Sequence, residues 1–227
     1  IKGSEKPDEV VIISAHLDHI GILKNGDVNN GADDDGSGTV ALLKIAKAFK
    51  TAVDDGHRPK RSVLFLHVTG EELGLYGSRY YTDVDPIFPL SNTVADLNID
   101  MIGRVVAKHE TDRNYLYLIG SDKLSTELHD ISEAVNNTYF NMEFDYTYND
   151  DNDPNRFYYR SDHYNFAKNN IPVIFYFNGT HADYHKPTDT PDKIEYNLLE
   201  TRTRLIFYTA WELANREKRI VVDNLKS

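Results

Sequence analysis

The 227-residue sequence predicts an α/β fold in which a central sheet is sandwiched between helices. Short apolar runs typical of buried strands alternate along the chain with amphipathic stretches whose apolar residues recur at helical spacing. Strands that alternate with helices pack as a sheet covered by helices. The length suffices for a sizeable core, so we expect residues 1–227 to form a single domain.

Five runs are continuous and apolar enough to be buried strands, namely 10–15, 63–68, 95–99, 116–120 and 173–177. Three stretches carry an apolar face at helical spacing, namely 37–49, 124–135 and 198–214. The polar stretch 149–155 is expected to be a surface loop.

Charge and composition exclude several classes of protein. The 25 basic and 36 acidic residues give a net charge of -11, whereas nucleic-acid binding needs a basic face. The sequence contains no run of about 18 apolar residues, the length that could span a bilayer. Cysteine is absent, so any metal must be held by imidazole and carboxylate groups. The start at Ile1 rather than Met is typical of a piece of a longer precursor.

Polar side chains follow four of the predicted strands, where open α/β sheets collect their functional groups. His16 and Asp18 follow the first strand, Glu71 and Glu72 the second, and Asp100 the third. The strand at 173–177 leads into a loop with three further candidates, His181, Asp183 and His185. Each group alone is also compatible with an ordinary hydrogen-bonded or surface residue.

The stretch 31–38 combines three adjacent acids with glycines just before a predicted helix. A solvated turn with a helix cap is one interpretation. A cation is another, because adjacent carboxylates repel one another and a cation can hold one of them in a cleft. A phosphate-binding loop is excluded, since no Gly-Lys-Ser or Gly-Lys-Thr follows and the acids would repel phosphate.

The pair Glu71-Glu72 is the most informative motif. Two adjacent acids cannot point the same way, so one can bind a metal while the other handles a proton from water. Asp100 sits amid apolar residues and needs a partner. Two histidines and three carboxylates without sulfur suit zinc, or less often manganese or cobalt, and the odd carboxylate can bridge two ions.

These residues resemble the aminopeptidase Y-like family of co-catalytic zinc peptidases, which also contains glutaminyl cyclases and inactive receptor ectodomains. The resemblance runs from about Val10 to about Ile194. It rests on six motifs in the family's order, Ala15-His16-Leu17-Asp18, Asp34-Asp35-Gly36-Ser37-Gly38, Gly70-Glu71-Glu72-Leu73-Gly74, Asn98-Ile99-Asp100-Met101-Ile102-Gly103, Arg160-Ser161-Asp162-His163 and Tyr184-His185.

The resemblance implies a three-layer α/β sandwich with a central mixed, mostly parallel sheet. It also implies two zinc ions, one held by His16 and Asp100 and the other by Glu72 and His185, with Asp34 bridging them. Asp33 and Asp35 would then not be ligands.

Other roles carry over in the same way. Glu71 is expected to be the general base acting on water between the metals, and Tyr184 a donor to the oxyanion. Asp18 is expected to orient His16 from outside the metal shell. The substrate cleft is expected to include Arg160, Ser161 and Asp162.

We therefore expect a di-zinc aminopeptidase acting on peptides with a free amino terminus. A glutaminyl cyclase, an inactive binding module, and a carboxypeptidase or dipeptidase remain alternatives. The resemblance favours a secreted, periplasmic or surface-attached protein. A further hypothesis places five aromatic residues around a pocket for the first substrate residue, namely Tyr146, Tyr148, Phe157, Tyr158 and Tyr159.

Overall fold

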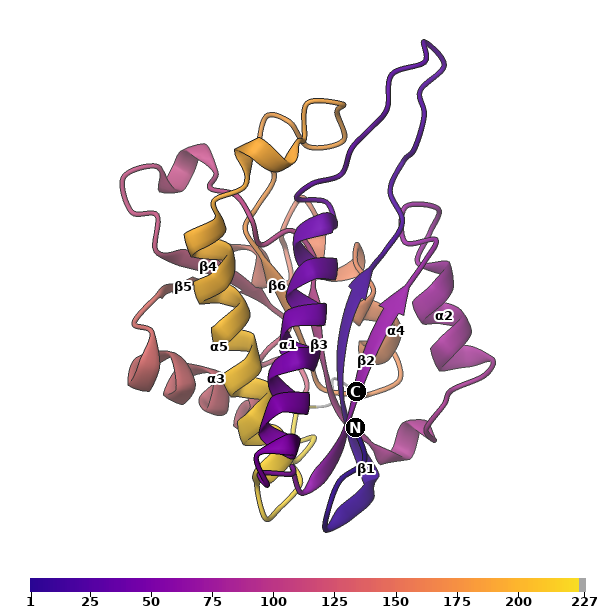
Figure 1. Cartoon of the computed structure of the whole chain (residues 1–227), viewed down its shortest axis with the longest axis vertical. Helices are drawn as coiled ribbons and strands as arrows, with labels where there is room; N and C mark the ends of the chain where they lie inside the picture. Colours follow the sequence, from indigo (N-terminus) through magenta and orange to yellow (C-terminus); the bar gives the residue numbers. More distant parts are fainter. Residues whose placement is uncertain (225–227) are drawn as a thin grey trace.

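A computed structural model describes residues 1–224 as a six-stranded sheet between two layers of helices (Figure 1). The strands are β1 (Lys6–His16), β2 (Arg61–Val68), β3 (Thr93–Ile99), β4 (Tyr115–Ile119), β5 (Glu143–Asp145) and β6 (Val173–Phe177). The α-helices are α1 (Gly36–Asp54), α2 (Tyr76–Asp83), α3 (Thr126–Tyr139), α4 (His163–Ala167) and α5 (Tyr196–Asn215). Short 3-10 helices cover Leu90–Asn92, Ala107–His109, Thr147–Asn149, Phe157–Tyr159 and Pro191–Lys193.

The strand order is β2-β1-β3-β6-β4-β5, and only the pair formed by β4 and β6 is antiparallel. The expectation of a mixed, mostly parallel sheet between helices is confirmed. All five predicted strands and three predicted helices form, with ends shifted by a few residues. The elements β5, α2 and α4 were missed, because they are short or carry polar residues where helical periodicity is read.

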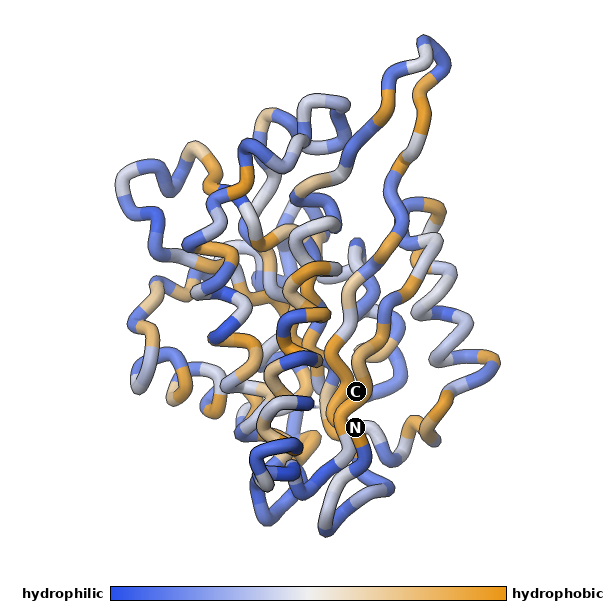
Figure 2. Tube along the Cα trace, viewed as in Figure 1, coloured by the Kyte–Doolittle hydropathy of each residue, from blue (hydrophilic) through white to orange (hydrophobic). Residues whose placement is uncertain are grey.

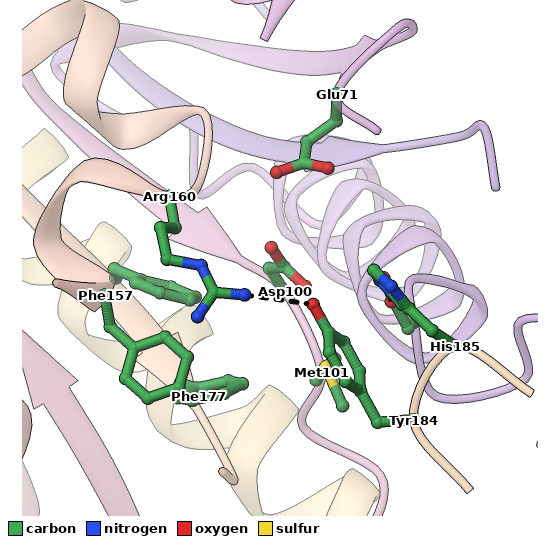
Figure 3. Close-up of a pocket in the computed structure, with 10 residues that line it drawn as sticks. Glu71, Asp100, Met101, Phe157, Arg160, Phe177, Tyr184 and His185 are labelled. Carbon is green, nitrogen blue, oxygen red and sulfur yellow. Dashed lines mark hydrogen bonds and ion pairs between the residues drawn. The ribbon is translucent and has the colours of Figure 1, made fainter. Parts of the chain in front are cut away.

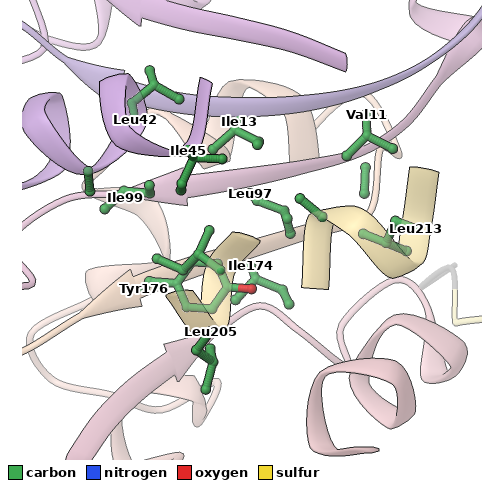
Figure 4. Close-up of a cluster of buried hydrophobic side chains, with 14 of the residues drawn as sticks. Val11, Ile13, Leu42, Ile45, Leu97, Ile99, Ile174, Tyr176, Leu205 and Leu213 are labelled. Atoms are coloured by element: carbon green, nitrogen blue, oxygen red, sulfur yellow. The ribbon is translucent and has the colours of Figure 1, made fainter. Parts of the chain in front are cut away.

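Alternate residues of β1 enter different layers of the core. Val11 and Ile13 pack with residues of α1 and α5, whereas Val10 and Ile12 pack with Tyr81 of α2 and with α4. Figure 4 shows the first of these clusters, and Figure 2 shows the hydrophobic strands at the centre of the molecule. Since a central parallel strand is covered on both faces, it reads as one continuous apolar run.

The strands β1, β2, β3 and β6 run in one direction, so their carboxyl ends meet at one edge of the sheet. The loops that follow them gather there, including the long extension between β1 and α1 (Figure 1). Within the described residues no helix is long and apolar enough to cross a membrane.

Candidate metal centre

The five predicted ligands meet at this edge of the sheet. His16 ends β1, and its Nε2 lies 3.3 Å from Asp34 Oδ1 and 3.7 Å from Asp100 Oδ1. His185, from the loop after β6, places its Nε2 3.0 Å from Asp34 Oδ2 and 3.3 Å from Glu72 Oε2. The two oxygens of Asp34 thus face different imidazoles.

Several of these nitrogen and oxygen atoms are suited to bind metal ions, because they form no hydrogen bonds with one another. His16 Nε2, Asp34 Oδ2 and Glu72 Oε1 are buried, and none has a hydrogen-bond partner in the part of the chain that the structure describes. Leaving such atoms unpaired is costly. The ligand atoms of His16, Asp34 and Asp100 lie close enough together to hold one ion, and His185 Nε2 lies beside the oxygens of Asp34 and Glu72. Imidazole nitrogens and carboxylate oxygens are ligands that zinc takes in proteins.

The electrostatics of the centre also call for cations. Burial by itself lowers the pKa of His16, but the Asp100 and Asp34 carboxylates raise it well above its usual range. Burial would raise the pKa of Asp34, yet His16 and His185 hold it below its usual range. The acids and imidazoles therefore stabilise each other's charged forms, and bound cations would take over that role from protonated imidazoles.

Glu71 lies on the opposite wall of the pocket from Tyr184 and His185 (Figure 3). Burial, Asp100 and other nearby acids raise the pKa of Glu71 to about 10 when only the protein's own charges act on it. Cations beside it would favour its charged form, since a bound ion reverses the local effect of clustered acids.

Asp18 holds the loop that bears the two glutamates. Its carboxylate accepts hydrogen bonds from the Glu71 and Glu72 backbone N–H groups, at 3.2 and 3.4 Å. His16 Nδ1 lies 2.9 Å from the backbone carbonyl of Asp18 and 3.7 Å from its carboxylate. The orienting contact expected from the Asp18 side chain is thus made by its main chain.

Asp35 joins three segments around the centre. Its carboxylate caps α1 by accepting from Gly38 N at 2.9 Å, and it also accepts from His16 N at 3.2 Å and Met101 N at 3.1 Å. Asp33 is likewise buried and accepts from His181 and Gly103. Both acids hold the protein together around Asp34 and lie outside the ligand groups.

Of the three residues expected in the substrate cleft, only Arg160 lines the pocket. Ser161 is buried and donates to Asp100 Oδ2 at 2.7 Å, and Asp162 is buried and accepts from Ser78. The expectation that all three residues line the cleft was wrong for Ser161 and Asp162. Successive residues of this segment point in different directions, so only Arg160 faces the pocket.

The apolar wall of the pocket differs from the five aromatic residues that the sequence-based hypothesis placed there. Of those five residues only Phe157 lines it, and Tyr146 instead donates a hydrogen bond to Glu133. The remaining wall comes from Met101, Phe175 and Phe177. The alternation of Phe175 and Phe177 on one face of β6 was the available signal. His19 was also missed, although it stands three residues after His16.

A family model described as "Peptidase family M28" matches residues 1–210. The chain belongs to this peptidase family. Among curated relatives of this M28 chain, "Probable glutamate carboxypeptidase VP8" of Zea mays is 37% identical over 100 residues, which are 44% of the chain and 13% of the relative. "Aminopeptidase YwaD" of Bacillus subtilis is 32% identical over 102 residues, which are 45% and 20%.

The fold of the M28 chain is similar to that of BSAP, a zinc aminopeptidase from Bacillus subtilis. The TM-score is 0.72 at 22% identity, over 98% of this chain and 52% of that structure's chain. The chain thus spans about half the length of that solved relative, and its matches span a fifth or less of the two curated relatives.

Proposed function

We propose that this chain is the catalytic part of a di-zinc aminopeptidase that removes the first residue of peptides. The observation that carries the proposal is the position of Asp34, whose two oxygens face His16 and His185, with Glu71 beside them and outside both ligand groups. One ion would be held by His16 and Asp100, the other by Glu72 and His185, and both by Asp34.

The zinc ions, when bound, polarise the scissile carbonyl and lower the pKa of water toward about 7. Glu71 takes a proton from the attacking water while the oxygen of that water bonds to the carbonyl carbon. Glu71 then gives that proton to the amine nitrogen as the C–N bond breaks. Tyr184 is placed across the pocket from Glu71 and donates its hydroxyl hydrogen to the developing oxyanion (Figure 3).

Two features of the pocket bear on the substrate. Met101, Phe157, Phe175 and Phe177 favour an apolar side chain on the first residue. The acids that crowd the centre favour a positively charged substrate amine, which agrees with cleavage at the amino end. The family resemblance alone supports action outside the cytoplasm.

A carboxypeptidase or dipeptidase is the second candidate, because Arg160 is exposed on the pocket wall and can receive a carboxylate. Its guanidinium lies 3.4 Å from the Tyr184 hydroxyl. A glutaminyl cyclase is a weaker candidate, because by the same resemblance it uses one zinc ion and lacks the doubled Asp-Asp-Gly motif found here at Asp34-Asp35-Gly36, whereas the centre offers two groups that could each hold an ion.

The test compares six substrates with the purified protein of known metal content. We expect two zinc ions per chain and release of product from leucyl and phenylalanyl anilides, but not from their acetylated forms. Cleavage of an amino-blocked peptide at its carboxyl end would establish the second candidate instead. Cyclisation of a glutaminyl peptide without hydrolysis, or a chain without tightly bound metal, would contradict the proposal.

A further inference from the structure

A third imidazole, that of His19, lies beside the carboxylates of Glu72 and Asp34. His19 Nδ1 lies 2.8 Å from Glu72 Oε1 and 3.9 Å from Asp34 Oδ2. The His19 side chain is only 11% exposed, and neither of its ring nitrogens has a hydrogen-bond partner among residues 1–224. A buried imidazole with both nitrogens unpaired requires an explanation.

The contact between His19 Nδ1 and Glu72 Oε1 has the distance of an ion pair but not the geometry of a hydrogen bond, and neither atom has a hydrogen-bond partner in the described structure. His16 Nε2 has the same character, since it is buried, unpaired and 3.3 Å from Asp34 Oδ1. Nitrogen and oxygen atoms at these distances without hydrogen-bond alignment are compatible with ligands of a common ion.

The separations match the size of a zinc shell. Zinc lies about 2.0 to 2.2 Å from nitrogen and oxygen ligands, so two ligand atoms of one ion are about 2.9 Å apart at right angles and about 4.2 Å apart when opposite. The distances from His19 Nδ1 to Glu72 and Asp34 are 2.8 and 3.9 Å. His19, Asp34 and Glu72 accordingly form a group able to hold an ion.

The backbone leaves room for this ring at one position. A Cβ built on Gly31 would lie 2.7 Å from His19 Cγ and 2.8 Å from His19 Cδ2. The absence of a side chain at Gly31 therefore lets the imidazole lie against the loop that carries Asp34. The ring of His185 approaches the same carboxylates from another direction, with its centroid 5.9 Å from that of His19.

We propose that His19 is a further ligand of the zinc ion held by Asp34, Glu72 and His185, an inference that rests on the proposed two-zinc function. That ion would have two imidazole ligands, whereas the ion at His16 and Asp100 would have one. The two sites should then differ in affinity, with the His19 site filling first and emptying last.

The test uses the wild-type chain, His19→Asn, and His129→Ala as control. Asn places an N–H near the position of Nδ1 but is a poor zinc ligand, so it preserves any hydrogen-bonding role. His129 is half-buried on α3 and contacts Ser121, away from the centre. Zinc content is followed by dialysis against graded chelator, and the folded state by circular dichroism.

We expect His19→Asn to weaken the tighter site by more than about 100-fold, beyond the range for groups that only orient a ligand. His129→Ala should change neither site. Zinc retention by His19→Asn within about threefold of wild type would overturn the inference.

A second measurement needs no variant. X-ray absorption of wild type loaded with one zinc per chain should detect two imidazoles, and one imidazole would contradict the ligand role. A wild type that binds no zinc contradicts the proposed function itself. An active two-zinc wild type with a single imidazole at the tighter site contradicts only the role of His19.

Discussion

At the scale of single residues, the centre depends on a carboxylate shared between two imidazoles. Asp34 is buried beside His16 and His185, and no other acid of the centre contacts both. In the proposed two-zinc centre, removal of the Asp34 carboxylate would take a ligand from both ions, whereas removal of Glu72 or Asp100 would affect one ion. Asp34 is therefore the position at which one substitution should disturb both metals.

We expect Asp34→Ala to abolish stoichiometric binding of both zinc ions and hydrolysis with it. Elemental analysis of the dialysed variant provides the measurement. Asp27→Ala, on the exposed extension between β1 and α1, is the control and should keep wild-type metal content. Two zinc ions per chain in Asp34→Ala would exclude the bridging role.

Glu71→Gln should separate binding from catalysis. Glutamine keeps the shape of the side chain but cannot take the proton, so we expect both zinc ions to remain and kcat to fall by about 10² to 10⁴. Glu72→Gln, one position along, should instead lower zinc content. Turnover of Glu71→Gln near that of wild type would remove Glu71 from the reaction.

The sequence predicts that His16, Asp34, Glu72, Asp100, His185 and Glu71 lie near one another, because each stands at a strand end or in a motif of acids and glycines. The structure brings these six side chains together, and their roles as ligands and general base stay predictions. The sequence does not predict that His19 contacts Glu72 or that Ser161 donates a hydrogen bond to Asp100. These contacts depend on where a loop turns back and which way each side chain points. The apolar pocket wall was mispredicted for the same reason, since aromatic residues in a loop pack against each other as readily as around a ligand.

At the scale of elements, the start of α1 fixes several parts of the centre at once. The Asp35 carboxylate accepts three backbone hydrogen bonds, from Gly38 in α1, from His16 at the end of β1, and from Met101 after β3. A cap that also joins two strand ends ties the position of the helix to that of the ligands.

Asp35→Ala should therefore lower the free energy of unfolding by about 2 to 4 kcal/mol, since it removes the cap and leaves buried N–H groups unpaired. Asp35→Asn keeps an acceptor oxygen and should cost less than the alanine variant. Urea unfolding of the three proteins gives the comparison. A loss below about 0.5 kcal/mol in Asp35→Ala would show that these hydrogen bonds are replaced.

The short helix α4 carries a built-in sensitivity to acid. His163 is buried and its ring stacks on Phe175, with centroids 4.8 Å apart. Burial lowers the pKa of His163 from 6.5 to about 3. The unfolded chain therefore binds this proton more readily than the folded protein, so stability is complete above pH 6.5 and declines as the pH falls toward 3.

His163→Phe should remove this part of the acid response. At pH 4.5 the histidine costs the wild type about 2 to 3 kcal/mol relative to neutral pH, from about 1.4 kcal/mol for each pH unit below the unfolded pKa. Unfolding free energies of both proteins at pH 7 and pH 4.5 supply the measurement. An equal loss in both proteins would show that His163 does not contribute.

At the scale of the whole molecule, strand order explains why distant parts of the chain meet. The four strands that lead into the proposed ligands and Glu71 are neighbours and parallel, in the order β2-β1-β3-β6. Alternating patterns predict strands and helices but not the order of strands in the sheet, nor the reversal of β4. The layers were therefore predictable, and the sheet order was not derivable from the patterns.

The same convergence concentrates negative charge in a chain that already carries -11, so metal removal should weaken the entire fold. Zinc at the proposed centre would bind the folded chain and not the unfolded one, and saturation at a thousand times the dissociation constant would contribute about 4 kcal/mol. For a chain of this size that corresponds to a fall in Tm of about 10 °C on chelation. Differential scanning calorimetry with and without chelator tests this, with Asp34→Ala as the control whose Tm should not respond. If wild type and Asp34→Ala respond equally to the chelator, the stabilising metal lies elsewhere than at this edge of the sheet.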